Sequence, residues 1–532
     1  MNPKVDPNRS ILQSLNPATL ETVGEVQITR PEEVAGIVRK AREKFPAWRD
    51  LGLKKRTRIL KNAQRLLLER ADDLARMVTL EMGRPYVESV VMELEASVDL
   101  VGYYADRAPK FLKDRNVPLH NIFFRRRKSF VHFEPLGVLG VIAPWNWPLL
   151  IPLGFIAPGL LAGNAIVFKH SELTPLLAVK IREVFLEAGV PEAVFQIVQG
   201  FGDAGAALVD AQTERIFFTG STEVGSKVME HASRSLKKAV LELGGSDPAL
   251  VCEDADIENA SSGIVWGGFN NCGQNCNSIE RVYVHESVAE RFLERVVEKT
   301  KRLRVGDGMD PATDIGPLAS AAQLKKTESI VRAARAGGGK LLCGGKRPPE
   351  LKGFFFEPTV ILWSRSNPAP AEEELFGPLI YITPVADDEE AVRLANRSRF
   401  GLAASVWTSN GKRGEAIARR IESGTVMVND AVVSFGIAEA GWTGVKMSGV
   451  GWVHGQKGLD EMVNIQYIHR DRQNRIQKYW WFPYTGKMVE GMKAGMTFLF
   501  GRGIIKRIAV VPTVLKHFAA YLVLNRRRRD KW

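Results

Sequence analysis

The sequence has few of the residues on which disulfide-stabilised and metal-dependent proteins rely. It has 532 residues but only four cysteines (Cys252, Cys272, Cys276 and Cys343), and its eight histidines form no cluster along the chain. Four thiols in so long a chain make no disulfide framework, and Cys272 and Cys276 lack the paired spacing of a zinc site. We therefore expect no bound metal, and a working thiol would indicate a reducing, cytoplasmic location.

We also expect neither an export signal nor a membrane-spanning run. Met1–Pro7 has charges and prolines instead of the apolar stretch of a signal peptide. The uncharged run from Pro135 to Phe168 is long enough to span a bilayer, but Pro144, Pro148, Pro152 and Pro158, with several glycines, would break such a helix. A buried strand, a loop and the start of a packed helix explain the run better.

The basic charge of the chain lies almost entirely at one end. The net charge is +13, and residues 466–532 hold 15 Lys and Arg against 3 Asp and Glu, whereas residues 1–465 hold 58 against 57. The body of the protein is thus nearly neutral, and the high isoelectric point does not indicate nucleic-acid binding.

The rest of the chain has the composition of a large globular protein. Helical patterns at Pro31–Trp48 and Arg56–Met82 alternate with short apolar strand candidates at Ala165–Phe168, Ala249–Val251 and Thr425–Val428. Such alternation is typical of α/β folds with mostly parallel sheets, and the length predicts two or three lobes. We find no internal repeat.

One cysteine lies in a segment that suggests chemistry. Phe269–Ser278 is polar and contains glycine, and Cys276 lies within it. Even the small thiolate fraction of a free cysteine at neutral pH attacks carbonyl carbon well, so Cys276 is a candidate nucleophile. The alternative is a buried structural cysteine, and Cys272 is the weaker candidate.

Four further segments occur with the cysteine segment in a characteristic order. They are Pro144–Pro148, Phe218–Gly225, Leu241–Gly245 and Glu373–Pro378. Together the five segments resemble the aldehyde dehydrogenase superfamily, from about Leu15 to about Asn464. Only Cys276 fits the Gly-Gln-x-Cys spacing of that family.

The resemblance implies a fold and a division into domains. We expect a Rossmann-like NAD-binding domain (1–120 and 135–245), an α/β catalytic domain (246–445) and a β-hairpin oligomerisation element with bridging segments (121–134 and 446–470). The chain would then form a homo-oligomer, a dimer or a tetramer. The basic run Arg125–Lys128 lies in the hairpin and is either a solvated strand or part of a lipid-facing surface.

The resemblance also assigns catalytic roles. Cys276 would attack an aldehyde, Asn146 and the backbone N–H of Cys276 would form the oxyanion hole, and Glu242 would be the general base that activates water. Asn146 could instead be a turn residue, and Glu242 could only cap backbone near Gly244. Relatives that transfer the acyl group to coenzyme A typically lack this glutamate, so its presence favours release of a free acid.

The cofactor implied is NAD. Gly220–Lys227 nearly spells a phosphate-binding P-loop, but its lysine comes one place late, and no GxGxxG fingerprint follows an early strand. In the family this segment opens a helix against the pyrophosphate, and the carboxylate of Glu172 would disfavour the extra phosphate of NADP without excluding it. The cofactor residues implied are Trp145, Lys169, Glu172, Gly220, Ser221, Gly225, Gly244, Glu374 and Phe376.

The sequence departs from the family in two places. Near the aldehyde entrance the usual Pro-Phe-Gly-Gly-x-Lys-x-Ser-Gly-x-Gly-Arg is replaced by Gly441–Trp452, without the proline, one glycine and the arginine. A basic extension then occupies residues 471–532, with the aromatic run Tyr479–Tyr484, methionines at helical spacing (Met488, Met492 and Met496) and the cluster Arg526–Arg529.

No uncharged run in the extension reaches the length of a membrane span. Its aromatic residues, apolar helical spacing and basic charge suggest an element that lies on an anionic membrane at the cytoplasmic face. The alternative is a tail that packs on its own oligomer or has no fixed structure, and RNA binding ranks lower.

We therefore expect NAD-dependent oxidation of an aldehyde to a carboxylic acid, with lipophilic aldehydes suggested by the tail. Leu241–Pro248 looks like the same segment of some semialdehyde enzymes, so a succinate-semialdehyde-type dehydrogenase is one alternative. A membrane-bound scaffold with a vestigial enzyme body is another, although the intact set of Cys276, Glu242 and Asn146 argues against it.

Overall fold

The computed structural model describes residues 10–121, 124–125, 127–364, 373–472, 478, 480–482 and 484–528, with backbone alone for 521–528. The chain forms two compact units. One comprises Met1–Lys113 and Phe133–Ile465, and the other comprises Asp114–His132 and Gln466–Trp532. The predicted division of the first unit into cofactor and catalytic domains stays a prediction.

A mostly parallel six-stranded sheet forms one half of the first unit. Only the pairing of its edge strand β19 with β9 is antiparallel. Its strands, in spatial order, are β19 (Gly449–Val450), β9 (Lys238–Glu242), β8 (Arg215–Thr219), β5 (Val138–Ile142), β6 (Ala165–Lys169) and β7 (Phe195–Val198).

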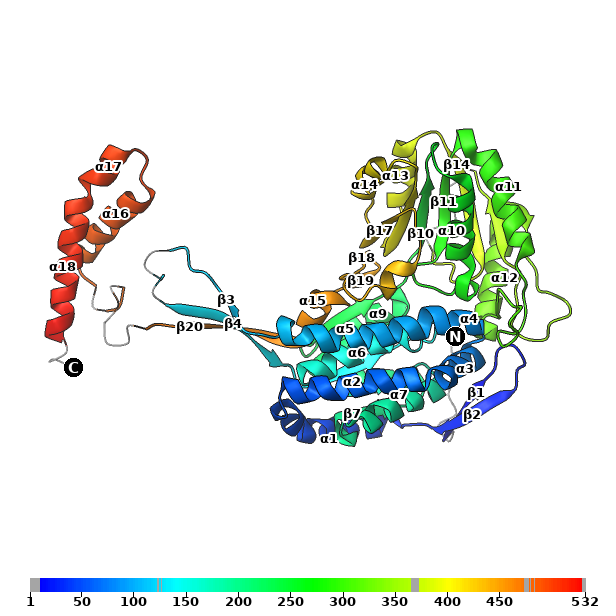
Figure 1. Cartoon of the computed structure of the whole chain (residues 1–532), viewed down its shortest axis with the longest axis horizontal. Helices are drawn as coiled ribbons and strands as arrows, with labels where there is room; N and C mark the ends of the chain where they lie inside the picture. The colour runs from blue at the N-terminus through cyan, green and yellow to red at the C-terminus, as the bar shows by residue number, and fades with distance from the viewer. Residues whose placement is uncertain are drawn as a thin grey trace. The chain divides into compact units, whose positions relative to one another are not determined.

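Helices cover this sheet, and α2, α5 and α6 lie side by side (Figure 1). The helices of this half are α1 (Pro31–Asp50), α2 (Leu53–Glu69), α3 (Ala71–Met82), α5 (Glu95–Phe111), α6 (Leu150–Ala162), α7 (Pro175–Ala188), α8 (Gly202–Asp210) and α9 (Thr222–Ser233). The pattern expected over Arg56–Met82 is divided between α2 and α3, because the backbone turns at Arg70 (φ −100°, ψ 17°) without a glycine or proline to signal it.

The uncharged run Pro135–Phe168 folds as expected. It comprises β5, a loop and α6, followed by β6, and all residues of α6 are buried. Its apolar character thus reflects burial on every side. Among the residues that the structure describes, no helix is both long and apolar enough to cross a bilayer.

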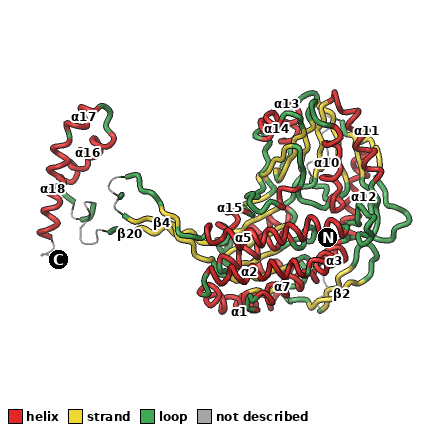
Figure 2. Tube along the Cα trace, in the orientation of Figure 1, coloured by secondary structure: helices red, strands yellow, loops and turns green. Residues whose placement is uncertain are grey.

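A seven-stranded sheet forms the other half of the first unit. Apolar clusters cover both its faces, and in Figure 2 the strands lie between helices on either side. Its strands, in spatial order, are β12 (Lys340–Cys343), β13 (Thr359–Leu362), β14 (Leu379–Val385), β11 (Ile279–His285), β10 (Asp247–Val251), β16 (Ala403–Trp407) and β17 (Thr425–Val428).

Neighbouring residues of β10 show how the two faces are filled. Ala249 and Val251 belong to the cluster under α10 (Ile257–Phe269), α11 (Glu286–Arg302) and α12 (Ala321–Ala336). Leu250 belongs to the cluster under α13 (Asp388–Asn396) and α14 (Gly411–Ala418). Since successive side chains of a strand point to opposite faces, the short apolar strand is fully buried, as in other parallel sheets. The expected α/β class with parallel sheets is confirmed.

Short elements complete the first unit. They are the hairpin of β1 (Ile11–Leu15) and β2 (Thr22–Gln27), the pair β15 (Phe400–Gly401) and β18 (Val445–Lys446), the helices α4 (Tyr86–Glu88) and α15 (Gly455–Asp460), the π-helix Ser89–Leu94 and the 3-10 turns Glu192–Val194, Asn270–Gly273 and Val433–Gly436.

The second unit contains a three-stranded sheet and helices. Strand β4 (Lys128–Pro135) lies between β20 (Val463–Arg470) and β3 (Arg115–Asn116). The helices α16 (Gly486–Phe500), α17 (Ile504–Ala509) and α18 (Val511–Arg528) contact one another.

Arg127, from the basic run in the hairpin, is mostly covered. Its guanidinium lies 5.1 Å from the ring centre of Trp480 and 4.8 Å from that of Phe124. Arg127 Nη2 is 3.4 Å from a carboxylate oxygen of Asp471. This arginine therefore joins the start of the extension to the hairpin. Arg126, Tyr479, Pro483 and the side chains of Arg526–Arg529 lie outside the described residues.

Candidate active site

The cysteine segment is a tightly turned loop after α10. Asn271, Cys272 and Gly273 have φ values of 52°, 56° and 68°, so three consecutive residues adopt left-handed backbone conformations. A Cβ at Gly273 would lie 2.1 Å from the carbonyl oxygen of Gly377, so only glycine fits there. The side-chain amides of the loop hold this shape, as in the 3.0 Å bond from Asn275 Nδ2 to the carbonyl of Asn270.

The two cysteines of the loop have different surroundings. Cys272 is 1% exposed and belongs to the apolar core under α10, whereas Cys276 is partly exposed. Of the two, Cys276 is therefore the thiol that a substrate can reach. Burial raises the pKa of the Cys276 thiol, and the carboxylates of Asp247, Glu374 and Glu242 raise it further. The resting group is therefore a thiol, and its attack on a carbonyl needs a base.

Asn146 is tied directly to the cysteine loop. Its Nδ2 donates to the carbonyl of Gln274, two residues before Cys276, at 3.0 Å. The backbone carbonyl of Asn146 accepts hydrogen bonds from Asn271 Nδ2 at 3.1 Å and from Arg84 Nη2 at 2.6 Å. A side-chain amide has two N–H groups, so among the described residues the second N–H of Asn146 remains available for a further acceptor.

A buried ion pair fixes the loop that carries Asn146. Arg84 and Glu93 are 1% and 0% exposed and pair with each other. The other oxygen of Glu93 accepts from the backbone N–H groups of Leu149 and Leu150, at 2.6 and 2.8 Å. The guanidinium of Arg84 also lies 4.0 Å from the ring centre of Trp147. Glu93 thus holds the start of α6, and Arg84 holds the loop before it.

Glu242 is the last residue of β9 and is 4% exposed. Its Oε2 accepts a 2.8 Å hydrogen bond from the indole Nε1 of Trp442, and its Oε1 has no partner among the described residues. Burial raises the pKa of Glu242 well above its usual range, and the Trp442 bond opposes that rise. Through its effect on the pKa of Cys276, this carboxylate is linked to the thiol electrostatically.

The predicted phosphate segment lies at the start of a helix. Ser221 is the N-cap of α9, and its Oγ accepts from the N–H of Val224 at 3.3 Å. A Cβ on Gly225 would lie 2.3 Å from the Leu243 side chain, so this glycine lets α9 pack closely on the segment after β9. The N–H of Gly220 donates to the carbonyl of Glu242 at 3.1 Å. A helix N-terminus in such a position suits an anion.

Lys169 and Glu172 form the expected pair at the end of β6. Their charged atoms are 3.7 Å apart, with the lysine 6% and the glutamate 39% exposed. Burial lowers the pKa of Lys169, and Glu172 partly opposes this. Among the described residues, neither Lys169 nor Glu172 bonds to the cysteine loop, so this pair forms a separate part of the candidate site.

The remaining predicted cofactor residues meet beside the cysteine loop. Glu374 Oε1 accepts from the N–H of Gly245 at 3.2 Å, and a Cβ on Gly244 would lie 2.8 Å from Glu374 Oε2. The rings of Trp145 and Phe376 meet edge to face with their centres 5.5 Å apart. These contacts bring together residues far apart in sequence.

Three supporting features had no clear signal in the sequence. Trp442 lies in the altered entrance segment, and its one signal in the sequence is an aromatic residue with an N–H in place of phenylalanine. The Arg84–Glu93 pair and Glu280, whose Oε1 accepts the N–H groups of Leu375 and Phe376 at 2.9 Å, are revealed by the fold alone.

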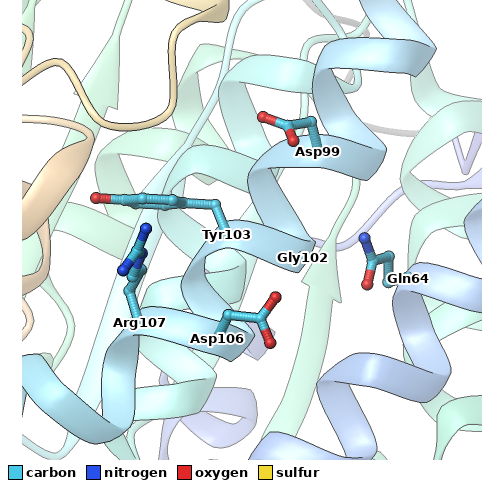
Figure 3. A pocket seen from close by; sticks show the side chains of 6 residues that line it. All are labelled: Gln64, Asp99, Gly102, Tyr103, Asp106 and Arg107. Atoms are coloured by element: carbon cyan, nitrogen blue, oxygen red, sulfur yellow. The ribbon is translucent and has the colours of Figure 1, made fainter.

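Other parts of the described chain offer less chemistry. No group of three or more His, Cys, Asp or Glu residues there is arranged to hold a metal ion. A polar cavity of about 270 Å³ between α2 and α5 contains none of the predicted site residues. Figure 3 shows Gln64 on one side of it and Asp106 on the other, with Tyr103 and Arg107 next to each other on α5.

Comparison with known proteins gives a consistent result. Residues 4–468 match the sequence model described as the aldehyde dehydrogenase family. A betaine aldehyde dehydrogenase from Brucella melitensis biotype 2 (strain ATCC 23457) is 36% identical over 462 residues, which cover 86% of this chain and 93% of the relative.

Two solved structures are similar along most of their length. The NAD+ complex of an aldehyde dehydrogenase from Mycobacterium tuberculosis has a TM-score of 0.83 at 33% identity, covering 87% of this chain and 95% of its own. The NAD+ complex of an aldehyde dehydrogenase from Bacillus cereus has a TM-score of 0.83 at 32% identity, covering 87% and 94%.

Proposed function

The chain belongs to the aldehyde dehydrogenase family, and from that membership we propose that it oxidises an aldehyde and water to a carboxylic acid through a thioester on Cys276. Its cofactor is NAD. The observation that carries the proposed mechanism is the hydrogen bond from Asn146 to the loop that holds Cys276. Glu242 is linked to the same thiol through its effect on the pKa of that thiol.

The residues present fit NAD. The start of α9 at Ser221 offers N–H groups for the pyrophosphate, and the Lys169–Glu172 pair suits the hydroxyls of the adenosine ribose. Glu374 and Phe376, beside the cysteine loop, would hold the nicotinamide riboside. When bound by these residues, NAD would supply the acceptor for the hydride that leaves the substrate carbon. The carboxylate of Glu172 would repel a 2′-phosphate, so NAD is preferred to NADP.

Attack by Cys276 begins the reaction. Its S–H proton passes to a base as the sulfur bonds to the aldehyde carbon, and the C=O electron pair moves onto oxygen. The free N–H of Asn146 and the backbone N–H of Cys276 stabilise the resulting oxyanion. One such donor is typically worth about 3 kcal/mol in the transition state.

Glu242 acts in the hydrolysis of the thioester. Its carboxylate takes a proton from water while the water oxygen bonds to the acyl carbon. The C–S bond then breaks with its electron pair on Sγ, which restores the cysteine and releases the acid. A buried carboxylate with a raised pKa is a stronger base than an exposed one, as this step requires.

Substitution of the nucleophile and the base tests this mechanism. Cys276→Ser is expected to abolish NADH formation, and Glu242→Gln to retain a first burst of NADH but lose steady turnover. The assay uses aldehydes graded by length and charge, including betaine aldehyde and succinate semialdehyde, with NAD and with NADP. Steady turnover by Cys276→Ser would overturn the thioester mechanism, and a preference for short acidic aldehydes would favour a semialdehyde dehydrogenase over an enzyme for lipophilic substrates.

We further propose that the extension binds an anionic membrane at the cytoplasmic face. In α17, Ile504, Ile505 and Ile508 are 61% to 81% exposed, beside Lys506 and Arg507. The other exposed apolar side chains of the extension include Trp481, Phe482, Tyr484, Val489, Met496, Phe498, Phe500, Leu515 and Phe518. Apolar and basic side chains exposed together are typical of interfacial helices.

Sedimentation with vesicles tests this second proposal. The wild type should bind vesicles that contain phosphatidylserine better than neutral ones, and deletion of residues 478–532 should abolish binding. Each basic residue adds about 1 kcal/mol near such a surface, so Lys506→Gln with Arg507→Gln should weaken binding about thirtyfold. Cys276→Ser should bind like the wild type. Unchanged binding after the deletion would reject the membrane role.

A further inference from the structure

Trp442 makes a contact that the usual residue of the family could not make. The altered entrance segment has tryptophan where relatives usually have phenylalanine. The indole is 2% exposed, and its N–H donates to Glu242 Oε2 at 2.8 Å. A phenyl ring has no N–H, so this hydrogen bond to the proposed base is a property of this sequence.

The surrounding segment fixes the donor. Trp442 and Val453 exchange two backbone hydrogen bonds, of 2.7 and 2.9 Å. The ring of Phe435 meets the indole edge to face, with the ring centres 5.2 Å apart. The same segment continues into β19, where Gly449 pairs with Glu242. Donor and acceptor are therefore held by one continuous piece of chain.

The two oxygens of Glu242 have different roles in this arrangement. Oε2 is occupied by the indole, whereas Oε1 is buried and has no partner among the described residues. We propose that Trp442 is a positioning residue that holds Oε2, so that Oε1 is aimed at the water that hydrolyses the Cys276 thioester. This inference rests on the proposed function of Glu242 as general base.

The electrostatic surroundings support such a role. The Trp442 hydrogen bond stabilises the ionised form of Glu242 and opposes the effect of burial on its pKa. The titratable group linked to Glu242 is the thiol of Cys276, on which Asp247 and Glu374 also act. Since Asp247 and Glu374 are carboxylates, neither of them stabilises a negative Glu242, and the indole of Trp442 is the group that does.

The titratable and charged groups behind Trp442 act elsewhere. The ring of His454 is 4.5 Å from that of Phe435, and burial lowers the pKa of this histidine to about 3, so it is neutral. Lys457 Nζ lies 3.3 Å from the centre of the Trp452 ring. Neither contributes to the shifted pKa of Glu242.

Trp442→Phe removes the N–H and retains an aromatic ring against Phe435. Without its donor, Glu242 should hold its proton to higher pH. The pH profile of kcat, measured with saturating aldehyde and NAD, should therefore have its acid limb about one pH unit higher. Turnover should recover at higher pH. A loss of packing alone would lower the rate without moving this limb.

Hydrolysis of an activated ester provides a readout without NAD. With p-nitrophenyl acetate, the first burst of nitrophenolate reports acylation of Cys276, and the steady rate reports deacylation. At pH values below the shifted acid limb, Trp442→Phe should retain the burst but slow the steady rate about tenfold. The matched control, Phe435→Leu, disturbs the packing behind the indole but keeps the N–H, so its acid limb should stay in place.

The outcomes separate this inference from the proposed function. If Glu242→Gln has the wild-type pH profile, the base assignment fails, and the role of Trp442 fails with it. If Glu242→Gln is impaired but Trp442→Phe keeps the wild-type acid limb, only the role of Trp442 is overturned. If the wild type oxidises no aldehyde, the proposed function fails, and the ester assay still decides whether Trp442 acts through Glu242.

Discussion

At the scale of single residues, the thiol and the base share one electrostatic environment. Cys276 is the less buried of the two cysteines in its loop, yet burial and three carboxylates raise its pKa. Burial also raises the pKa of Glu242. Burial thus disfavours the charged form of both groups, and the Trp442 hydrogen bond opposes this effect for Glu242.

The raised pKa of Cys276 can be measured by alkylation without NAD. The reaction follows the thiolate fraction, so with iodoacetamide the rate should still rise about tenfold per pH unit through pH 9, where a free thiol of pKa about 8.5 begins to level off. Subtraction of the rate of Cys276→Ser removes the contribution of the other thiols. A plateau below pH 8 would contradict the raised pKa.

At the scale of elements, buried carboxylates hold the starts of two helices. Glu93 accepts the N–H groups of Leu149 and Leu150 at α6. Glu81, at the end of α3, accepts those of Leu176 and Leu177 at α7, each at 2.9 Å, together with the hydroxyl of Ser14. Neither helix start has a capping side chain of its own. The caps therefore come from distant sequence.

Glu81→Leu should destabilise the protein through this second cap. It leaves one buried and one partly buried N–H group and a hydroxyl without this acceptor, which should lower the free energy of unfolding by about 2–4 kcal/mol. Glu81→Gln keeps one acceptor oxygen and serves as the matched control with a smaller loss. Urea unfolding followed by circular dichroism measures both, and equal midpoints for the two variants would contradict the capping role.

At the scale of the whole molecule, the three-stranded sheet of β20, β4 and β3 exposes a strand edge. β20 lies at the edge of its three-stranded sheet, and Ile465 and Tyr467 on this strand are 54% and 53% exposed. Exposed edge strands pair readily with other chains unless they are covered. We therefore propose that β20 contributes to a homo-oligomer, as expected from the resemblance to the family.

Charges on one face of β20 test its role in assembly. Ile465→Lys with Tyr467→Lys places two like charges on the same face and should convert the oligomer to a monomer, as measured by light scattering. Gln466→Lys, on the opposite face, is the matched control and should change the mass little. An unchanged mass for the double variant, or a monomeric wild type, would reject this interface.

Much of the candidate site could be predicted from the sequence. Glycine carries an unmistakable local signal where the backbone turns left-handed or packs closely, as at Gly273 and Gly225, and the polar run around Cys276 stands out among apolar elements. The break at Arg70 could not be predicted, because neither glycine nor proline marks it and tertiary packing decides it.

The sequence by itself determined the alternation of helices and strands, the order of the functional segments and the concentration of positive charge after residue 465. These properties depend on local periodicity and composition. Tertiary structure alone decided that Asn146 bonds to the cysteine loop, that Arg84 pairs with Glu93 and that Trp442 holds Glu242. The last contact joins residues 200 positions apart, and only the pairing of β19 with β9 brings them together.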